Sequence, residues 1–146
     1  MDPAIVFLFL FPPLFVATWF LSLHFIAAVG GWRELARVYA ATGPIAAVAE
    51  WRNRGARLGF ATKYNGCVNI AVSSMGMQLS LWRILRIGHP PLFIPWSDIR
   101  TEPVRRMFAD YVRFSFARAA PTLLLRSALA EEVLRASHRI ASAPRP

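Results

Sequence analysis

The sequence of 146 residues contains a single cysteine and few histidines. Cys67 has no second cysteine to pair with, which excludes an internal disulfide framework. It lies in the strand-like segment "GCVNIAV" without a nearby histidine, so we expect a small core residue and not a nucleophile. His24, His89 and His138 are too widely spaced for a metal site. We therefore expect no metal, no cofactor and no catalytic residues.

Acidic side chains and lysine are also scarce. Eight Asp and Glu residues oppose 17 Lys and Arg residues, for a net charge of +9, and Lys63 is the single lysine. Because arginine binds phosphate with a planar fork, this composition favours anionic partners, either nucleic acid or acidic phospholipid headgroups. An arginine bias in the genome explains the same composition equally well. Of the two anionic partners, nucleic acid is the less favoured.

Charged residues are absent between Ala4 and Val29. At about 1.5 Å per residue, a helix of that length exceeds the roughly 30 Å hydrocarbon core of a bilayer. We predict a transmembrane helix, loosened or kinked at Pro12 and Pro13. Asp2 precedes it and arginines follow it, so the N-terminus is expected outside an inner (cell) membrane and the C-terminal part in the cytoplasm. Cleavage of this segment as a leader, which leaves a periplasmic or secreted domain, is the alternative.

The segment "GWRELARVYAATGP" predicts a short amphipathic helix next to the membrane. Trp32, Leu35 and Tyr39 recur on one face, whereas Arg33 and Arg37 form an i,i+4 pair on another. We expect residues 45–59, which follow, to form a helical or loop connector.

From Leu58 onward the apolar period changes to two, which predicts antiparallel strands. "CVNIAV" and "MQLSLW" alternate, as does "VRFSF" further on, and "PTLLLR" predicts another short strand. Asn65-Gly66 predicts a tight hairpin, and "SSMG" predicts the next turn. "SALAEEVLRASHRI" predicts an amphipathic C-terminal helix capped by Ser127.

The segment "RIGHPPLFIPWSDI" combines a glycine, a histidine and three prolines. "GHPP" predicts a compact loop, and Pro95 predicts an edge strand or a bulge. Trp96 and Ile99 are predicted as buried core anchors, and Asp98 as a turn former. Neither a nucleophile nor a glycine-rich phosphate loop accompanies His89 and Asp98, so this segment is expected to be architectural.

The order of these elements resembles that of bacterial pleckstrin-homology-like (PH-like) domains. It consists of short strands, an "IPWSDI" strand and turn, further strands and a last amphipathic helix. "GWRELARVY", "GMQLSL" and "RIGHPPLFIPWSDI" resemble a group of bacterial single-pass membrane proteins with one helix ahead of such a module. The resemblance covers about residues 32 to 141. It implies a mainly β fold with helices: a transmembrane helix, then an antiparallel sheet or barrel of about seven strands capped by a C-terminal helix. The single lysine of "KYNG" departs from the basic first hairpin of eukaryotic lipid-binding PH domains.

Four segments follow from these patterns. They are an anchor (1–31), a juxtamembrane helix and connector (32–56), a PH-like domain (57–141) and a disordered tail (142–146). We expect a non-enzymatic, membrane-anchored cytoplasmic module that binds a protein partner or an anionic lipid surface; an enzyme with an unrecognised site is an alternative. The side chains nominated for anionic lipid are Arg33, Arg37, Arg100, Arg105 and Arg106, the last three around the predicted "TEPV" turn.

Overall fold

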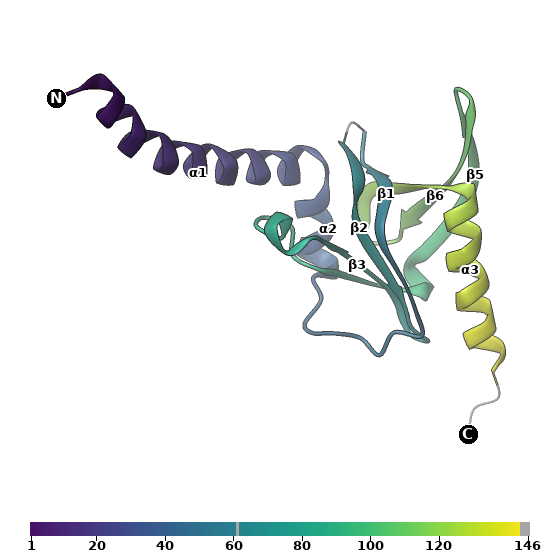
Figure 1. Ribbon diagram of the computed structural model, residues 1–146. Coiled ribbons are helices and arrows are strands. Elements are labelled where there is room, and N and C mark those ends of the chain that lie inside the picture. The colour runs from purple at the N-terminus through teal and green to yellow at the C-terminus, as the bar shows by residue number, and fades with distance from the viewer. Residues whose placement is uncertain (61, 144–146) are drawn as a thin grey trace.

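The computed structural model describes residues 1–60 and 62–143. A long helix, α1 (Pro3–Val29), projects away from a β module and connects to it through the short helix α2 (Trp32–Tyr39) (Figure 1). The chain ends with helix α3 (Ser127–Ser142). The strands between α2 and α3 are β1 (Ala49–Leu58), β2 (Thr62–Val72), β3 (Gly76–Leu81), β4 (Leu92–Pro95), β5 (Ile99–Arg106), β6 (Ala109–Phe116) and β7 (Ala119–Arg126).

The seven strands form one antiparallel sheet in the order β4-β3-β2-β1-β7-β6-β5. The first and last strands meet at the centre of this order, where Arg57 and Leu58 of β1 pair with Leu124 and Leu123 of β7. The predicted fold class is confirmed: an apolar N-terminal helix precedes a seven-stranded antiparallel sheet, and a C-terminal helix follows it.

Helix α1 is long and apolar enough to cross a membrane, judged by length and composition alone. It begins at a cap in which the Asp2 side chain accepts a hydrogen bond from the Ala4 amide, and it continues through Pro12 and Pro13. Most of its apolar side chains are exposed, and only Leu23 and Ala27 are buried against the rest of the chain.

The larger apolar residues of the alternating segments on β2 and β3 are buried. Strand geometry sends every second side chain to the same face of the sheet, so the apolar set of each strand packs inward together. The members of this set on β2 and β3 are each at most 1% exposed: Val68, Ile70, Val72, Met77, Leu79 and Leu81. Helix α3 adds Leu129, Ala130 and Val133 to the same core.

The sequence misplaced the first strand and the first turn. Strand β1 lies within residues 45–59, where a helical or loop connector was predicted, and that prediction was wrong. The hairpin predicted at Asn65-Gly66 is also wrong, because β2 runs through both residues and Gly59 (φ +62°) follows β1 instead. Gly66 (φ +66°) and Asn53 (φ +57°) serve a different purpose: they accompany the register shifts of the β1–β2 pair.

The "IPWSDI" segment is partly as predicted. Pro95 ends β4, an outermost strand of the sheet, where its missing N–H removes no ladder hydrogen bond. Trp96 and Ile99 are half-buried and pack against the core, so the prediction of full burial was wrong. The "TEPV" residues form no turn; they lie within β5, the other outermost strand, which tolerates Pro103. Ser127 is not the cap of α3, because Arg126 holds that position.

Candidate functional site

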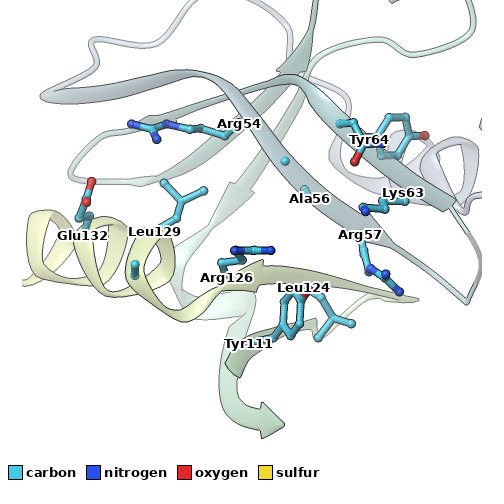
Figure 2. Close-up of a pocket in the computed structure, with 13 residues that line it drawn as sticks. Arg54, Ala56, Arg57, Lys63, Tyr64, Tyr111, Leu124, Arg126, Leu129 and Glu132 are labelled. Atoms are coloured by element: carbon cyan, nitrogen blue, oxygen red, sulfur yellow. The ribbon is translucent and has the colours of Figure 1, made fainter. Parts of the chain in front are cut away.

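A cavity of about 370 Å³ lies between β1, β2, the end of β7 and the start of α3. We call it the basic pocket, because four cationic side chains line it. Figure 2 shows Arg54, Arg57 and Lys63 on the two hairpin strands and Arg126 at the end of β7. The other polar residues of its wall are Tyr64, Asn65, Tyr111 and Glu132.

The strand register explains why three of these cations, Arg57, Lys63 and Arg126, meet. Arg57 lies directly opposite Lys63 across the β1–β2 pair, so both side chains leave the same face of the sheet. Arg57 also pairs with Leu124 of β7, and Arg126 is two residues further along on that face. Tyr111 of β6 pairs with Arg126, so its side chain lies on the same face of the sheet as the cations. Three separate segments of chain thus present positive charge to one place.

The basic pocket carries an excess of positive charge, because its four cations are accompanied by the single carboxylate of Glu132 among the described residues. Among the described residues, the four cations make no ion pair with a carboxylate. The Nε of Arg57 is buried and finds no hydrogen-bond acceptor in the described part of the chain. Glu132 instead accepts a hydrogen bond of 2.7 Å from the Trp51 indole. A concave surface with uncompensated arginines attracts and holds anions.

Helix α3 contributes to the same electrostatic field. Its first turn borders the basic pocket through Ala128 and Leu129. The free N–H groups of a helix N-terminus carry a partial positive charge, which favours a bound anion. Phosphate, sulfate and carboxylate are the groups that suit this combination of charge and donors.

A buried cluster links the basic pocket to the juxtamembrane helix. Tyr64 borders the pocket, and its hydroxyl lies 3.1 Å from Nε2 of His89, which is 1% exposed. Nδ1 of His89 lies 3.2 Å from the Ile87 carbonyl oxygen. These partners fit a neutral ring that donates from Nδ1 to the carbonyl and accepts from Tyr64 at Nε2. Burial raises the pKa of Tyr64, which keeps its hydroxyl protonated as the donor.

The segment between β3 and β4 (residues 82–91), which we call the His89 loop, has an architectural role in this structure. The Trp32 indole of α2 donates a hydrogen bond of 2.9 Å to the Pro90 carbonyl, and its ring packs edge-on against His89. Asp98 has different partners: its carboxylate accepts hydrogen bonds from Tyr39 at 3.0 Å and from Arg118 at 2.8 Å. The hydrogen bond from Arg118, then that from Tyr39, lowers the pKa of Asp98. His89 and Asp98 therefore stabilise two separate contacts of α2 and its surroundings.

The buried His89 predicts an acid-sensitive fold. Burial lowers the pKa of His89 below its ordinary value of 6.5, so the unfolded chain binds the proton more readily than the folded one. The stabilisation is therefore fully present above pH 6.5 and is lost as the pH falls below that value. We expect the free energy of unfolding to decrease by up to about 1.4 kcal/mol per pH unit in that range.

Chemical denaturation at a series of pH values measures this slope. His89→Gln should flatten it, whereas His138→Gln, on the exposed face of α3, should leave it unchanged. If His89→Gln keeps the pH slope of the wild type, protonation of His89 is not the cause of the acid sensitivity.

The structure separates the arginines nominated from the sequence into two groups. Arg33 and Arg37 are exposed and border a cavity at the α1–α2 junction. Arg100, Arg105 and Arg106 are exposed on the edge strand β5, where Arg105 lies 3.7 Å from Asp110. Figure 1 shows β5 on the side of the module away from α1. The two groups do not share a surface.

Sequence reasoning missed Arg54, Arg57, Lys63 and Arg126 as a group. The misplaced hairpin hid the pairing of Arg57 with Lys63, and Arg126 is far away in the chain. With the first hairpin placed correctly, Arg57 opposite Lys63 would have been the signal, since like charges directly opposite each other across a strand pair are destabilising. For Cys67, burial raises the pKa of the thiol, which disfavours the reactive thiolate. No group of three or more His, Cys, Asp or Glu side chains suited to a metal ion occurs among residues 1–60 and 62–143.

No family model matches the chain, and no curated protein matches it. Among solved structures, the chain is similar to the "Vps36 N-terminal PH domain". The TM-score is 0.42 at 12% sequence identity, over 66% of this chain and 82% of that chain. Nothing about ligand, partner or activity follows from a likeness of this degree.

Proposed function

We propose that the protein is a membrane-anchored binding module, not an enzyme, and that its basic pocket holds a phosphate group of its ligand. The observation that carries this proposal is the convergence of Arg54, Arg57, Lys63 and Arg126 on one cavity without paired carboxylates in the described chain. Arginine forks and a lysine supply the charge-assisted hydrogen bonds that phosphate oxygens accept.

In this proposal, residues 1–31 anchor the chain and the β module lies next to the bilayer. The apolar side chains that α1 exposes favour lipid as its surroundings. The arginines that follow α1 favour a cytoplasmic module with the N-terminus outside. The module remains close to the membrane surface because α2 begins almost directly after α1.

Titration with pyrophosphate tests the proposal. The full-length protein is reconstituted in nanodiscs of zwitterionic phosphatidylcholine, and binding is measured by isothermal titration calorimetry. We expect saturable binding of one pyrophosphate per chain that weakens as salt rises, because the pocket acts through exposed and half-exposed charges. Absence of saturable binding at millimolar pyrophosphate contradicts the proposal.

Removal of the pocket's carboxylate is expected to strengthen binding. Glu132→Gln deletes a negative charge that repels the anion, while the glutamine oxygen still accepts the Trp51 hydrogen bond. For an exposed charge we expect a gain of about 2- to 5-fold in pyrophosphate affinity. Glu131→Gln is the matched control, because Glu131 pairs with Arg135 and does not border the pocket. Equal gains in both variants indicate a general charge effect, which contradicts a defined site.

A further inference from the structure

A second basic cavity, of about 350 Å³, lies where α1 meets α2. We call it the junction pocket. Its polar wall consists of His24 from α1 and Arg33 and Arg37 from α2, and Gly88 and Pro90 of the His89 loop close its other side. The proposed binding of phosphate in the basic pocket does not involve any of these residues.

The two arginines of the junction pocket are free to bind a ligand. Trp32, Leu35 and Tyr39 bury one face of α2 against the module, which leaves the i,i+4 pair Arg33 and Arg37 together on the exposed face. Neither arginine forms an ion pair within the described residues. Two unpaired cations one helical turn apart form a clamp for a single anionic group.

The junction pocket lies beside the last turns of α1, not beyond its end. Gly88 packs against His24, so closely that a Cβ on the glycine would lie 3.5 Å from the His24 Cα. His24 precedes the helix end at Val29 by more than one helical turn. If α1 spans a bilayer, the junction pocket therefore lies at the depth of the lipid headgroups.

The loop that closes the junction pocket has the composition of a membrane interface. It carries the short helix η1 (Arg83–Leu85), and Gly88 of the same loop packs against His24 of α1. Trp82 and Ile84 are 45% and 61% exposed. The indole N–H of Trp82 already donates to Asn53 at 2.7 Å, so its exposed ring can enter the interface without an unpaired donor.

Helix α1 provides an apolar surface that continues from the junction pocket toward the bilayer. Phe20 and Leu21 lie four and three residues before His24 and share its face of the helix. Both are exposed, at 44% and 72%. Cationic groups at the headgroup level with an apolar surface directly beneath them match the two parts of a phospholipid.

We propose that the junction pocket binds the headgroup of an anionic phospholipid, with its phosphate between Arg33 and Arg37 and its acyl chains along α1. This inference rests on the proposed membrane span but is independent of the basic pocket. The bound lipid would fix the angle between α1 and the module, because it contacts both α1 and α2.

Lipid retention tests the inference. The full-length protein is reconstituted in nanodiscs with equal amounts of phosphatidylglycerol and phosphatidylcholine of matched chains, and native mass spectrometry measures which lipids remain bound. We expect wild type to retain phosphatidylglycerol preferentially. Arg33→Gln/Arg37→Gln should reduce this preference about 5- to 10-fold, and Arg33→Lys/Arg37→Lys should restore part of it, since lysine keeps the charge without the fork.

Arg135→Gln/Arg139→Gln is the matched control, because it removes an i,i+4 arginine pair from α3 at the same change in net charge. An equal loss of preference in this control, or an unchanged preference in Arg33→Gln/Arg37→Gln, overturns the inference. Resistance of the protein to extraction by carbonate shows separately whether α1 is inserted in the membrane. An extractable protein overturns both the anchor and this inference, whereas an inserted protein without lipid preference overturns the inference alone.

Pyrophosphate titration in phosphatidylcholine nanodiscs distinguishes a lipid phosphate from a free one. We expect Arg33→Gln/Arg37→Gln to bind pyrophosphate as wild type does. A second pyrophosphate site in wild type that this variant loses would assign the junction pocket to a soluble phosphate and overturn the lipid assignment.

Discussion

Glutamine at both Arg57 and Arg126 is expected to lower the pyrophosphate affinity of the protein about 100-fold or more. A hydrogen bond to a charged group contributes about 1.5–3 kcal/mol, and each 1.4 kcal/mol corresponds to a factor of about ten in affinity. Arg57 is half-buried and its Nε lacks an acceptor among the described residues, so it can bind an anion without first breaking another contact. Arg126 approaches the same cavity from the end of β7.

The same double variant should keep its stability. Arg57 faces Lys63 across the β1–β2 pair, and removal of one of two facing like charges relieves repulsion. We therefore expect an unchanged or slightly higher Tm, measured by circular dichroism, together with the loss of binding measured by calorimetry. Loss of binding with unchanged stability is expected when the two arginines serve binding and not folding.

Arg52→Gln/Arg139→Gln removes the same net charge outside the basic pocket and is the control for this prediction. A comparable loss of affinity in the control indicates attraction by net charge alone. An unchanged affinity in Arg57→Gln/Arg126→Gln places the pyrophosphate elsewhere. Either result contradicts the role of the basic pocket.

Trp32→Ala is expected to cost about 3–5 kcal/mol of the free energy of unfolding. The Trp32 side chain is 1% exposed and packs edge-on against Tyr64 and His89, with ring centroids 5.7 and 5.5 Å away. Its loss also removes the donor to the Pro90 carbonyl. Helix α2 has only eight residues and depends on packing for its stability, so it should separate from the sheet.

Chemical denaturation of the full-length protein in detergent measures this loss, and amide hydrogen exchange of α2 reports its separation. Trp82→Ala is the matched control, because Trp82 is 45% exposed and should cost far less. Trp96→Ala should be intermediate, since Trp96 is half-buried but donates a hydrogen bond of 2.9 Å to the Ser73 carbonyl. A smaller effect for Trp32→Ala than for Trp96→Ala contradicts the assignment of Trp32 as the residue that joins α2 to the module.

Asn65-Gly66 shows how a correct local inference led to a wrong element. Both residues favour a positive φ, and Gly66 does adopt φ +66°. A positive φ serves a strand irregularity as well as a hairpin turn, and nothing nearby in the chain distinguishes the two. The pairing of β1 with β2 decides the outcome, because it aligns Leu58 with Thr62 and leaves Asn65-Gly66 inside β2.

The amino-acid sequence by itself determined the features that depend on neighbouring residues. A long run without charged residues specified α1, alternation specified the inward faces of β2 and β3, and Pro95 predicted an edge strand or a bulge for β4. These features are local because helix and strand periods are set within a few residues.

Only the tertiary structure decided which cations lie together in the basic pocket. Arg57 meets Lys63 and Arg126 through the register of the β1–β2 and β1–β7 pairs, and a shift of one residue would send Arg57 to the other face. The junction pocket likewise requires the His89 loop to pack against α1, a contact between segments far apart in the chain. Register and packing depend on the whole fold, which is why the sequence paired Arg33 with Arg37 but located neither the cavity beside them nor the basic pocket.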